Sequence, residues 1–468
     1  MKPNFLFIFP DQHRGDWMPY SSETKKKLGV SELTLEVPNI KNLMENGVSF
    51  THAVSPSPVC APARACLAAG KRYVNCRVPN NGVNFDPTVP TFYGALKNDG
   101  YSVGGVGKFD LNKADLYWGK DKSGWHELLD QVGFTHTCDN EGKLDTIWGY
   151  YNETPGPYGK YLAGQGLMEA HAEDMIGRLR TNKDAPTPLP ENAYCDNWVT
   201  QNALDMLQEF PEEKPWFMQV NFVCPHDPWD VTAAMKDEYK ARTYPAPVEY
   251  SLNENNNGVR QNYASMINNI DKNIGKILAA IEARGDLENT IIIYSSDHGE
   301  MLGDHNMYGK SKPNQAAIHV PLVIDASRVG GLKGIENPSP VEMQDIAATI
   351  LEYAGLCMDT GLGSVSLKPV LDGNATKTRE YCVSELIWPI RNELAIPFGT
   401  VSDGRYKLIM TVGKDDRLYD LDNDPFECKE LAAGMPEVVN KLKRQFDERA
   451  PWANKGVIRA FEKAAKKS

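Results

Sequence analysis

Polar side chains that can bind a metal or a substrate follow four short apolar runs of the sequence. The runs are NFLFIF (4–9), YSVGGV (101–106), WFMQVNFV (216–223) and TIIIYSS (290–296). They are followed, in order, by Asp11 and Gln12, Lys108 and Asp110, His226 and Asp227, and Asp297 and His298. A single pair has a simpler interpretation, since SDHG alone is also typical of a turn whose aspartate caps a helix. Four pairs, each at the end of an apolar run, predict a metal-assisted active site.

The residue types in this set indicate which metal it would bind. Asp11, Gln12 and Asp297 offer oxygen atoms, and His298 adds one imidazole. Hard oxygen donors with a single imidazole favour Ca²⁺, with Mg²⁺ or Mn²⁺ as alternatives, over a structural zinc ion.

Cys60 lies where a proline-rich loop meets a helical run, in SPSPVCAPARACLAAGKR (55–72). A core cysteine would stand inside a periodic apolar segment, and Cys60 does not. Pro62 suits the first turn of a helix, so Cys60 is predicted at or just before the helix N-terminus. Backbone N–H groups favour an anion there, and Arg64 follows one turn later. A nucleophile beside a metal and such a helix end fits attack on a sulfate or phosphate ester.

The elements that must position these residues indicate an α/β fold. Near-continuous apolar runs, including VPLVID (320–325), are typical of strands buried on both faces of a mostly parallel sheet. Helical patterns lie between them, for example over 262–285, and predict helices that flank the sheet. Ligands of such sheets bind beyond the carboxyl ends of the strands, where the polar pairs lie.

Two domains are predicted. Residues 1–375 are expected to form the catalytic α/β domain, and residues 376–468 a smaller α+β subdomain. In the second part, GTVSDGRYKLIMTVGKDDRLYDLDNDP is typical of antiparallel strands, and MPEVVNKLKRQFDERA of a helix. The segment 140–190 is polar and rich in breakers, and is expected to be an irregular insertion over one edge of the sheet. The loops 140–190 and 227–260 are expected to decide specificity.

Composition excludes some partners. With a net charge of −12 over 468 residues, the chain has no basic excess for nucleic acid or an anionic membrane. No apolar run approaches the ~20 residues of a membrane helix, and the N-terminus lacks the features of a secretory signal. We expect a cytoplasmic protein, or a periplasmic or secreted one if a signal peptide preceded this numbering. Nine scattered cysteines predict mostly reduced, buried thiols rather than a disulfide framework.

Five segments resemble the type I, formylglycine-dependent sulfatases of the alkaline phosphatase superfamily. CAPAR (60–64) matches the Cys-x-Pro-x-Arg core of that family's signature. FPDQHRGD (9–16) and SSDHGEMLGDHNMYGKSKP (295–313) are similar to its two metal loops. GKFDLNK (107–113) replaces its Gly-Lys-Trp-His segment, and RLYDLDNDPFECKEL (417–431) is similar to its C-terminal signature. DQ (11–12) and RVPNNGV (77–83) resemble the branch that holds arylsulfatases and phosphonate monoester hydrolases.

The resemblance implies a mechanism. Cys60 would be oxidised to formylglycine by a formylglycine-generating enzyme or an anaerobic sulfatase-maturating enzyme. Its hydrate would attack sulfur while bound to the metal, which Cys60 would hold together with the four ligands above. The second hydroxyl would then expel sulfate and regenerate the aldehyde. The resemblance also implies charge stabilisation by Arg64, Lys108 and Lys310, general acid catalysis by His226, and an extra anion donor in Asn81.

Several roles stay open. Asp110 stands where the family has a histidine, and could be a base, bind a substrate hydroxyl or bind a cationic group. Ala69, where threonine is commoner, is expected to matter little. Lys312 competes with Lys310, and the preceding glycine favours Lys310.

Asp227 and Trp229 are candidate substrate-binding residues. Trp229, Trp148 and Tyr150 could line a sugar subsite or simply pack. Cys66 is expected to pack, and His52, His136 and His305 to lie at the surface or behind the site.

The function expected is hydrolysis of a sulfate monoester on a carbohydrate through formylglycine at Cys60, and the expected partner is a small-molecule or glycan sulfate ester. A phosphonate monoester or phosphodiester hydrolase using the same site is the alternative. A third possibility is a non-catalytic relative with unmodified Cys60, and the intact CAPAR argues against it.

Overall fold

An eight-stranded sheet forms the centre of the computed structural model, which describes residues 2–114, 124–181, 185–251, 256–361, 363–387 and 397–449. The strand order is β5-β4-β6-β1-β7-β8-β2-β9. The strands are β1 (Asn4–Ile8), β2 (Val48–Phe50), β4 (Ser102–Gly107), β5 (His136–Asp139), β6 (Trp216–Asn221), β7 (Thr290–Ser295), β8 (Leu322–Asp325) and β9 (Ile335–Asn337). The five strands from β5 to β7 run parallel, and β8 is antiparallel to both of its neighbours. The expected mostly parallel sheet is therefore confirmed.

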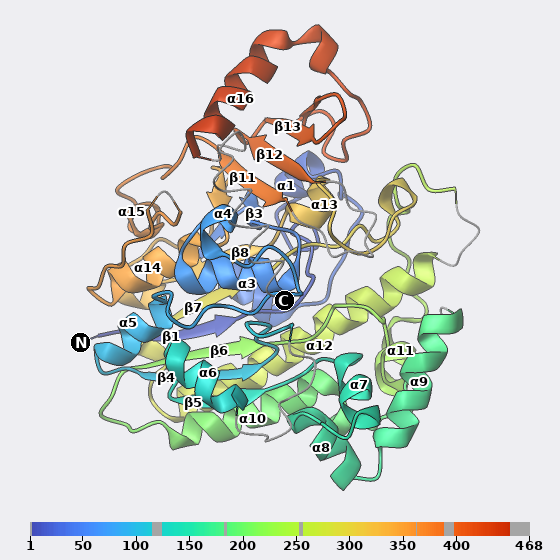
Figure 1. The fold of residues 1–468 in the computed structure, drawn as a ribbon, viewed down its shortest axis with the longest axis vertical. Helices are drawn as coiled ribbons and strands as arrows, with labels where there is room; N and C mark the ends of the chain where they lie inside the picture. Colours follow the sequence, from blue (N-terminus) through green and yellow to red (C-terminus); the bar gives the residue numbers. More distant parts are fainter. Residues whose placement is uncertain are drawn as a thin grey trace.

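The two faces of the sheet are covered by different helices (Figure 1). Phe5 and Phe7 of β1 pack into one hydrophobic core, and Leu6 and Ile8 pack into the other, because successive side chains of a strand point to opposite faces. The first face is covered by α3 (Cys60–Ala69), α5 (Phe92–Asn98) and α14 (Asp345–Tyr353). The second is covered by α2 (Pro38–Asn46), α10 (Cys195–Glu209) and α12 (Asn256–Ala283). Burial on both faces explains the continuous apolar runs.

The segment 140–190 is more regular than expected. It holds three helices, α7 (Asp145–Tyr151), α8 (Pro157–Gly164) and α9 (Met168–Thr181). Pro157 opens α8 at a position where proline is tolerated, and Leu162 and Met175 join the hydrophobic core. The prolines and glycines here mark helix ends, and the expectation of an irregular insertion was wrong for that reason.

Shorter elements complete this part of the chain. They are α1 (Ser22–Lys27), α4 (Tyr73–Cys76), α6 (Gly124–Val132), α11 (Ala233–Tyr239), α13 (Gln315–Ile318), α15 (Lys368–Leu371) and a parallel pair of β3 (Ala53–Val54) and β10 (Val341–Glu342). Among the described residues, no helix combines the length and the apolarity needed to cross a bilayer.

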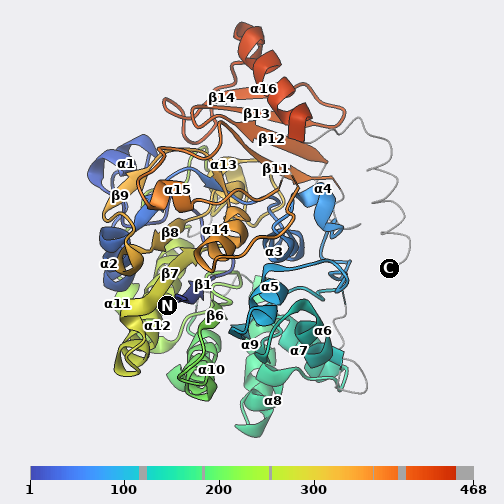
Figure 2. The ribbon, with the colours of Figure 1, turned by 90° about the vertical axis from the view of Figure 1, so that its left-hand side faces the viewer.

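A second, smaller sheet lies in the C-terminal part, drawn in orange and red in Figures 1 and 2. Its antiparallel strands are β11 (Cys382–Leu386), β12 (Phe398–Ser402), β13 (Tyr406–Thr411) and β14 (Arg417–Asp420). The helix α16 (Pro436–Arg449) packs on it through Leu442 and Phe446, which share a small core with Val401 and Leu408. Residues 450–468 of the predicted subdomain lie outside the described residues.

Candidate active site

The ends of four adjacent strands bring their polar side chains to one edge of the sheet. β4, β6, β1 and β7 are neighbours in that order. Ligand atoms of Asp11, Cys60, Asp297 and His298 all lie within 4.8 Å of one another, and all four residues are buried. The structure therefore brings together four of the five residues expected to bind a metal.

The hydrogen bonds around His298 and Asp11 fit a bound cation. His298 Nδ1 donates to the Gly299 carbonyl oxygen at 3.0 Å, which leaves Nε2, 3.2 Å from Cys60 Sγ, as the ring nitrogen that would face a metal ion. Such support of the second ring nitrogen is usual for a metal-binding imidazole. Asp11 Oδ1 lies 3.6 Å from His298 Nε2 and accepts no hydrogen bond from any described residue. A buried oxygen without a partner is costly unless a cation or water satisfies it.

Gln12, the fifth expected ligand, lies beside this cluster. Its Oε1 accepts a hydrogen bond from Lys310 Nζ at 3.1 Å, and its Nε2 donates to Asp227 Oδ1 at 3.1 Å and to Glu300. Glu300 also accepts from the backbone nitrogen of Gly309 at 2.6 Å. It thereby ties the first metal loop to the loop that carries Lys310. Sequence reasoning missed Glu300, although it stands inside the SSDHGEM segment.

Cys60 is the first residue of α3, and Pro62 lies in its first turn, both as expected. The backbone nitrogen of Ala61 donates to Asn81 Oδ1 at 3.0 Å, so Asn81 satisfies a helix N–H that has no partner within the helix. Cys66 lies in the hydrophobic core, which confirms that it packs. The described cysteines are all free thiols, and most are buried.

Cationic groups surround the sulfur atom of Cys60. Lys310 Nζ lies 3.0 Å from Sγ, and Lys108 Nζ lies 3.9 Å from it. Burial and the Asp11 carboxylate would raise the pKa of the Cys60 thiol. Lys108, Lys310 and His298 outweigh them, and the pKa lies well below its usual value. The unmodified thiol is therefore more acidic than an ordinary cysteine.

A glycine places Lys108. Gly107 ends β4 with a φ of 91°, and a Cβ atom there would lie 1.9 Å from the carbonyl oxygen of Asn221. Because only glycine tolerates this approach, the chain turns at the strand end and Lys108 binds the carboxylate of Asp11.

His226 and Lys310 contact each other across the site. His226 Nδ1 donates to the carbonyl oxygen of Asp227 at 2.5 Å, and its Nε2 lies 2.5 Å from Lys310 Nζ. Lys310 is therefore the lysine that reaches the site, and Lys312 is absent from the pocket wall described below.

Arg64 lies behind the two acidic ligands and does not face the pocket. Its Nε donates to Asp297 Oδ2 at 2.9 Å, and its Nη2 lies 3.3 Å from Asp11 Oδ2. Its side chain is 3% exposed. Where the resemblance implied contact with the sulfate oxygens, the structure places Arg64 as a support of the carboxylates.

Asp110 lies between two lysines. Its carboxylate is 3.4 Å from Lys108 Nζ and 3.2 Å from Lys113 Nζ, and it does not line the pocket. Burial would raise its pKa, but Lys108 and Lys113 lower it further than that. A carboxylate with a lowered pKa is a weak base, so this geometry favours orientation of the lysines over proton abstraction.

A pocket of about 190 Å³ opens in front of Cys60. Of the predicted residues, its wall contains Cys60, Asn81, Lys108, His226, Asp227 and Lys310. Sequence reasoning missed Lys113, Glu141, Lys143 and Asp145, which also line it. Three of these follow β5, a fifth parallel strand whose HTCD sequence is not apolar. Had β5 been recognised as a strand, these residues would have been predicted at its carboxyl end, where ligands of such sheets bind.

The candidate aromatic residues separate into two groups. Trp229 packs against Tyr308, with ring centres 5.5 Å apart, and is absent from the pocket wall. Its interpretation as packing is favoured. Trp148 is 54% exposed and Tyr150 40% exposed, so neither belongs to the core.

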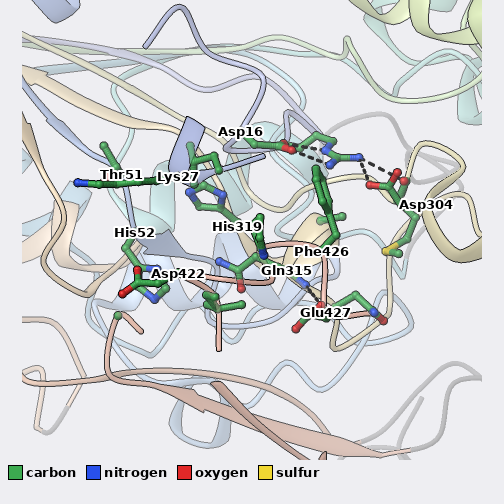
Figure 3. Close-up of a pocket in the computed structure, with 18 of the residues that line it drawn as sticks. Asp16, Lys27, Thr51, His52, Asp304, Gln315, His319, Asp422, Phe426 and Glu427 are labelled. Carbon is green, nitrogen blue, oxygen red and sulfur yellow. Dashed lines mark hydrogen bonds and ion pairs between the residues drawn. The ribbon is translucent and has the colours of Figure 1, made fainter. Parts of the chain in front are cut away.

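A second hollow, of about 100 Å³, lies between the metal loops and the C-terminal sheet (Figure 3). Arg14 pairs there with Asp16 at 2.7 Å and with Asp304 at 2.9 Å. His52 and His305 line it, and His52 is buried, with Nε2 3.0 Å from Ser402 Oγ. His136, on β5, is half-buried. Among the described residues that line this hollow, none belongs to the Cys60 cluster. The ion pairs of Arg14 there connect the two metal loops.

Comparison with known proteins agrees with this geometry. The family model "Sulfatase" matches residues 3–356, and the model "N-sulphoglucosamine sulphohydrolase, C-terminal" matches residues 303–451. An arylsulfatase of Clostridium perfringens is 26% identical, over 99% of this chain and 95% of its own length. An N-acetylglucosamine-6-O-sulfatase of Bacteroides thetaiotaomicron is 22% identical, over 94% of this chain and 84% of its own length.

The fold is also that of a solved phosphonate monoester hydrolase of Agrobacterium radiobacter. The TM-score is 0.76 at 24% identity, and the match covers 95% of this chain and 96% of that chain. Because the first family model spans well over half of the sequence, the chain belongs to the sulfatase family and is a sulfuric ester hydrolase.

Proposed function

We propose that the protein hydrolyses a sulfate monoester through formylglycine made from Cys60. The observation that carries this proposal is the position of Cys60 at the N-terminus of α3, 3.2 Å from His298 and 3.0 Å from Lys310. When both groups are present, the formylglycine hydrate supplies the hydroxyl that attacks sulfur, and a divalent cation supplies Lewis-acid polarisation.

Asp11, Asp297 and His298, with Gln12 beside them, would hold Ca²⁺, or Mg²⁺ or Mn²⁺ in its place. Arg64 supports this role, because its contacts with both carboxylates fix their orientation. A formylglycine-generating enzyme or an anaerobic sulfatase-maturating enzyme would oxidise Cys60, which is buried in the folded chain.

The remaining side chains act on the ester. Lys108, Lys310 and Asn81 line the pocket and would bind the sulfate oxygens. In its imidazolium form, His226 would keep its Nδ1 proton on the Asp227 carbonyl and give its Nε2 proton to the leaving oxygen. Asp227, on the same wall, would bind a hydroxyl group of the substrate.

A carbohydrate is the substrate class that the pocket mouth favours. Leu144 and Asp145 belong to the pocket wall, and Trp148 and Tyr151 follow on the same stripe of α7, three to four residues apart. Trp148 is 54% and Tyr151 56% exposed. Exposed aromatic rings that continue a pocket wall suit the apolar faces of sugar rings. The Bacteroides relative named for N-acetylglucosamine 6-sulfate gives further support.

The first experiment combines mass spectrometry with an ester assay. The protein is produced with a maturating enzyme, and the tryptic peptide 42–64, whose single cysteine is Cys60, is weighed. Replacement of the sulfur by an aldehyde oxygen is expected, while Cys66, in the next peptide, stays a thiol. Release of sulfate from nitrophenyl sulfate is then compared with hydrolysis of a phenyl phosphonate ester.

Each outcome of this experiment decides between functions. Faster turnover of the sulfate ester supports the proposal, and faster turnover of the phosphonate ester replaces it with the phosphonate hydrolase. A thiol at Cys60, in a host that modifies a control sulfatase, would overturn the formylglycine mechanism.

A further inference from the structure

Lys143 is a buried lysine whose ammonium group contacts residues 224–230, the loop that carries His226. It lies just after β5 and is 3% exposed. Its Nζ atom donates to Asp230 Oδ1 at 2.7 Å, to the Pro228 carbonyl oxygen at 2.8 Å and to the His226 carbonyl oxygen at 2.9 Å. An ammonium group has three N–H donors, so all of them are used on residues 226–230.

The same loop is held from its other side by α10. Asp196 Oδ1 accepts from the backbone nitrogen of Val223 at 2.8 Å, and the Tyr194 hydroxyl donates to the Asp230 carbonyl oxygen at 2.9 Å. These contacts hold the two ends of the loop. Lys143 holds its centre, where the His226 and Pro228 carbonyls flank the turn. Lys143 therefore fixes the backbone that carries the imidazole, whose ring also contacts the Asp227 carbonyl and Lys310.

Stability alone does not explain a lysine at this position. Burial of an ion pair costs much of what its attraction returns, and an apolar residue of similar size is often as stabilising. Burial would lower the pKa of Lys143, but the contact with Asp230 outweighs it and raises the pKa. The ammonium therefore stays charged and keeps all three donors.

We propose that Lys143 is a positioning residue for His226: it fixes the backbone on both sides of the turn, so that Nε2 of the imidazole meets the leaving oxygen. The proposal rests on the general-acid role of His226 under the proposed function. Lys143 also lines the pocket, so the test has to distinguish positioning from a general loss of binding.

The test uses leaving groups of different basicity. Lys143→Met is compared with the unmutated enzyme on aryl sulfates that range from a nitrophenol to an unsubstituted phenol, and on an alkyl sulfate. A good leaving group needs no proton in the transition state, whereas a poor one does. For nitrophenyl sulfate we expect kcat to fall by no more than about 3-fold. For the alkyl ester we expect a fall of about 10²-fold, since a general acid contributes about 10²–10⁴-fold.

Arg284→Met is the matched control. Arg284 also donates to one carboxylate, Asp286, and to two backbone carbonyls, those of Leu207 and Phe210. It lies just beyond α12, before β7 begins, at the opposite end of the strand from the site. Arg284→Met should lower the stability of the fold, and any change in kcat should be the same for every leaving group. In a His226→Ala background, Lys143→Met should change kcat by less than about 2-fold, because a residue that acts through another has no separate effect.

Hydrogen exchange provides a readout that needs no turnover. Backbone amides of residues 223–231 should exchange faster in Lys143→Met than in Arg284→Met. If the single variant does not fold because Asp230 is left unpaired, Lys143→Met combined with Asp230→Asn replaces it.

Two results would overturn the proposal: an equal loss of kcat for every leaving group, or unchanged exchange over residues 223–231. If the unmutated enzyme hydrolyses no sulfate ester, the proposed function fails, and the exchange data decide alone whether Lys143 holds the loop.

Discussion

Nζ of Lys310 lies 2.5 Å from Nε2 of His226, a residue 84 positions away in the sequence. The same ammonium group lies 3.0 Å from Cys60 Sγ. One lysine thus spans the distance between the reacting residue and the proposed acid. Its positive charge can stabilise negative charge at the reacting residue and at the leaving oxygen.

Replacement of this lysine should disable catalysis. Lys310→Met removes a cation from a buried site where it is worth more than in water, and kcat should fall about 10²- to 10³-fold on nitrophenyl sulfate. Lys312→Met is the matched control, because Lys312 is two residues away and absent from the pocket wall. Equal losses in the two variants would contradict the assignment of Lys310.

Removal of one carboxylate should abolish metal binding. Asp11→Asn is expected to lose Ca²⁺, measured by elemental analysis after dialysis. In the unmutated protein, Ca²⁺ at 100 times its dissociation constant should stabilise the fold by about 2.7 kcal/mol. Asp110→Asn should keep this stabilisation, because Asp110 pairs with lysines and lies outside the cluster. Retention of Ca²⁺ by Asp11→Asn would argue against the site.

Glu141 should make stability depend on pH. Burial raises the pKa of this carboxyl from 4.5 to about 7, although the backbone nitrogens of Gly159 and Tyr158 donate to it. The folded protein therefore holds the Glu141 proton more tightly than the unfolded chain. Protonated Glu141 contributes its full share to the free energy of unfolding below about pH 4.5, and this contribution is lost as the pH rises through about 7.

Glu141→Gln should remove that loss. Its stability relative to the unmutated protein should increase between pH 5 and 8, by at most about 3 kcal/mol, as measured by urea unfolding. Glu173→Gln, at an exposed position of α9, should show a difference that does not vary with pH. A constant difference for Glu141→Gln as well would rule out the raised pKa.

Trp148→Ala should weaken the binding of an oligosaccharide and spare a small ester. We expect KM for a sulfated oligosaccharide to rise about 10-fold, which corresponds to about 1.4 kcal/mol. KM for nitrophenyl sulfate should not change. Tyr150→Ala is the control, since Tyr150 is exposed on the same helix but two residues away, on the other side. Equal effects of the two substitutions would argue against a stripe of sugar-binding residues.

The sequence was sufficient to predict the convergence of Asp11, Lys108, His226 and Asp297. Each follows a run that is apolar because its strand is buried on both faces. Strands that run parallel end at the same edge, so their polar successors lie along that edge, and they meet because β4, β6, β1 and β7 are neighbours in the sheet. Proline and the helix pattern likewise placed Cys60 at the start of α3. These inferences depend on local periodicity, which a sequence displays directly.

Only the tertiary structure decided which donor meets which acceptor. Arg64 turned to the carboxylates instead of the pocket, Asp110 came to lie between two lysines, and Lys143 reached across to the His226 loop. The strand β5, which positions Lys143, carries too little apolar sequence to be recognised. The contacts of Arg64 and Lys143 join residues 53 to 233 positions apart, whereas Asp110 contacts lysines two and three positions away. Side chains of the same type compete for each partner, and only the distances in the folded chain select among them.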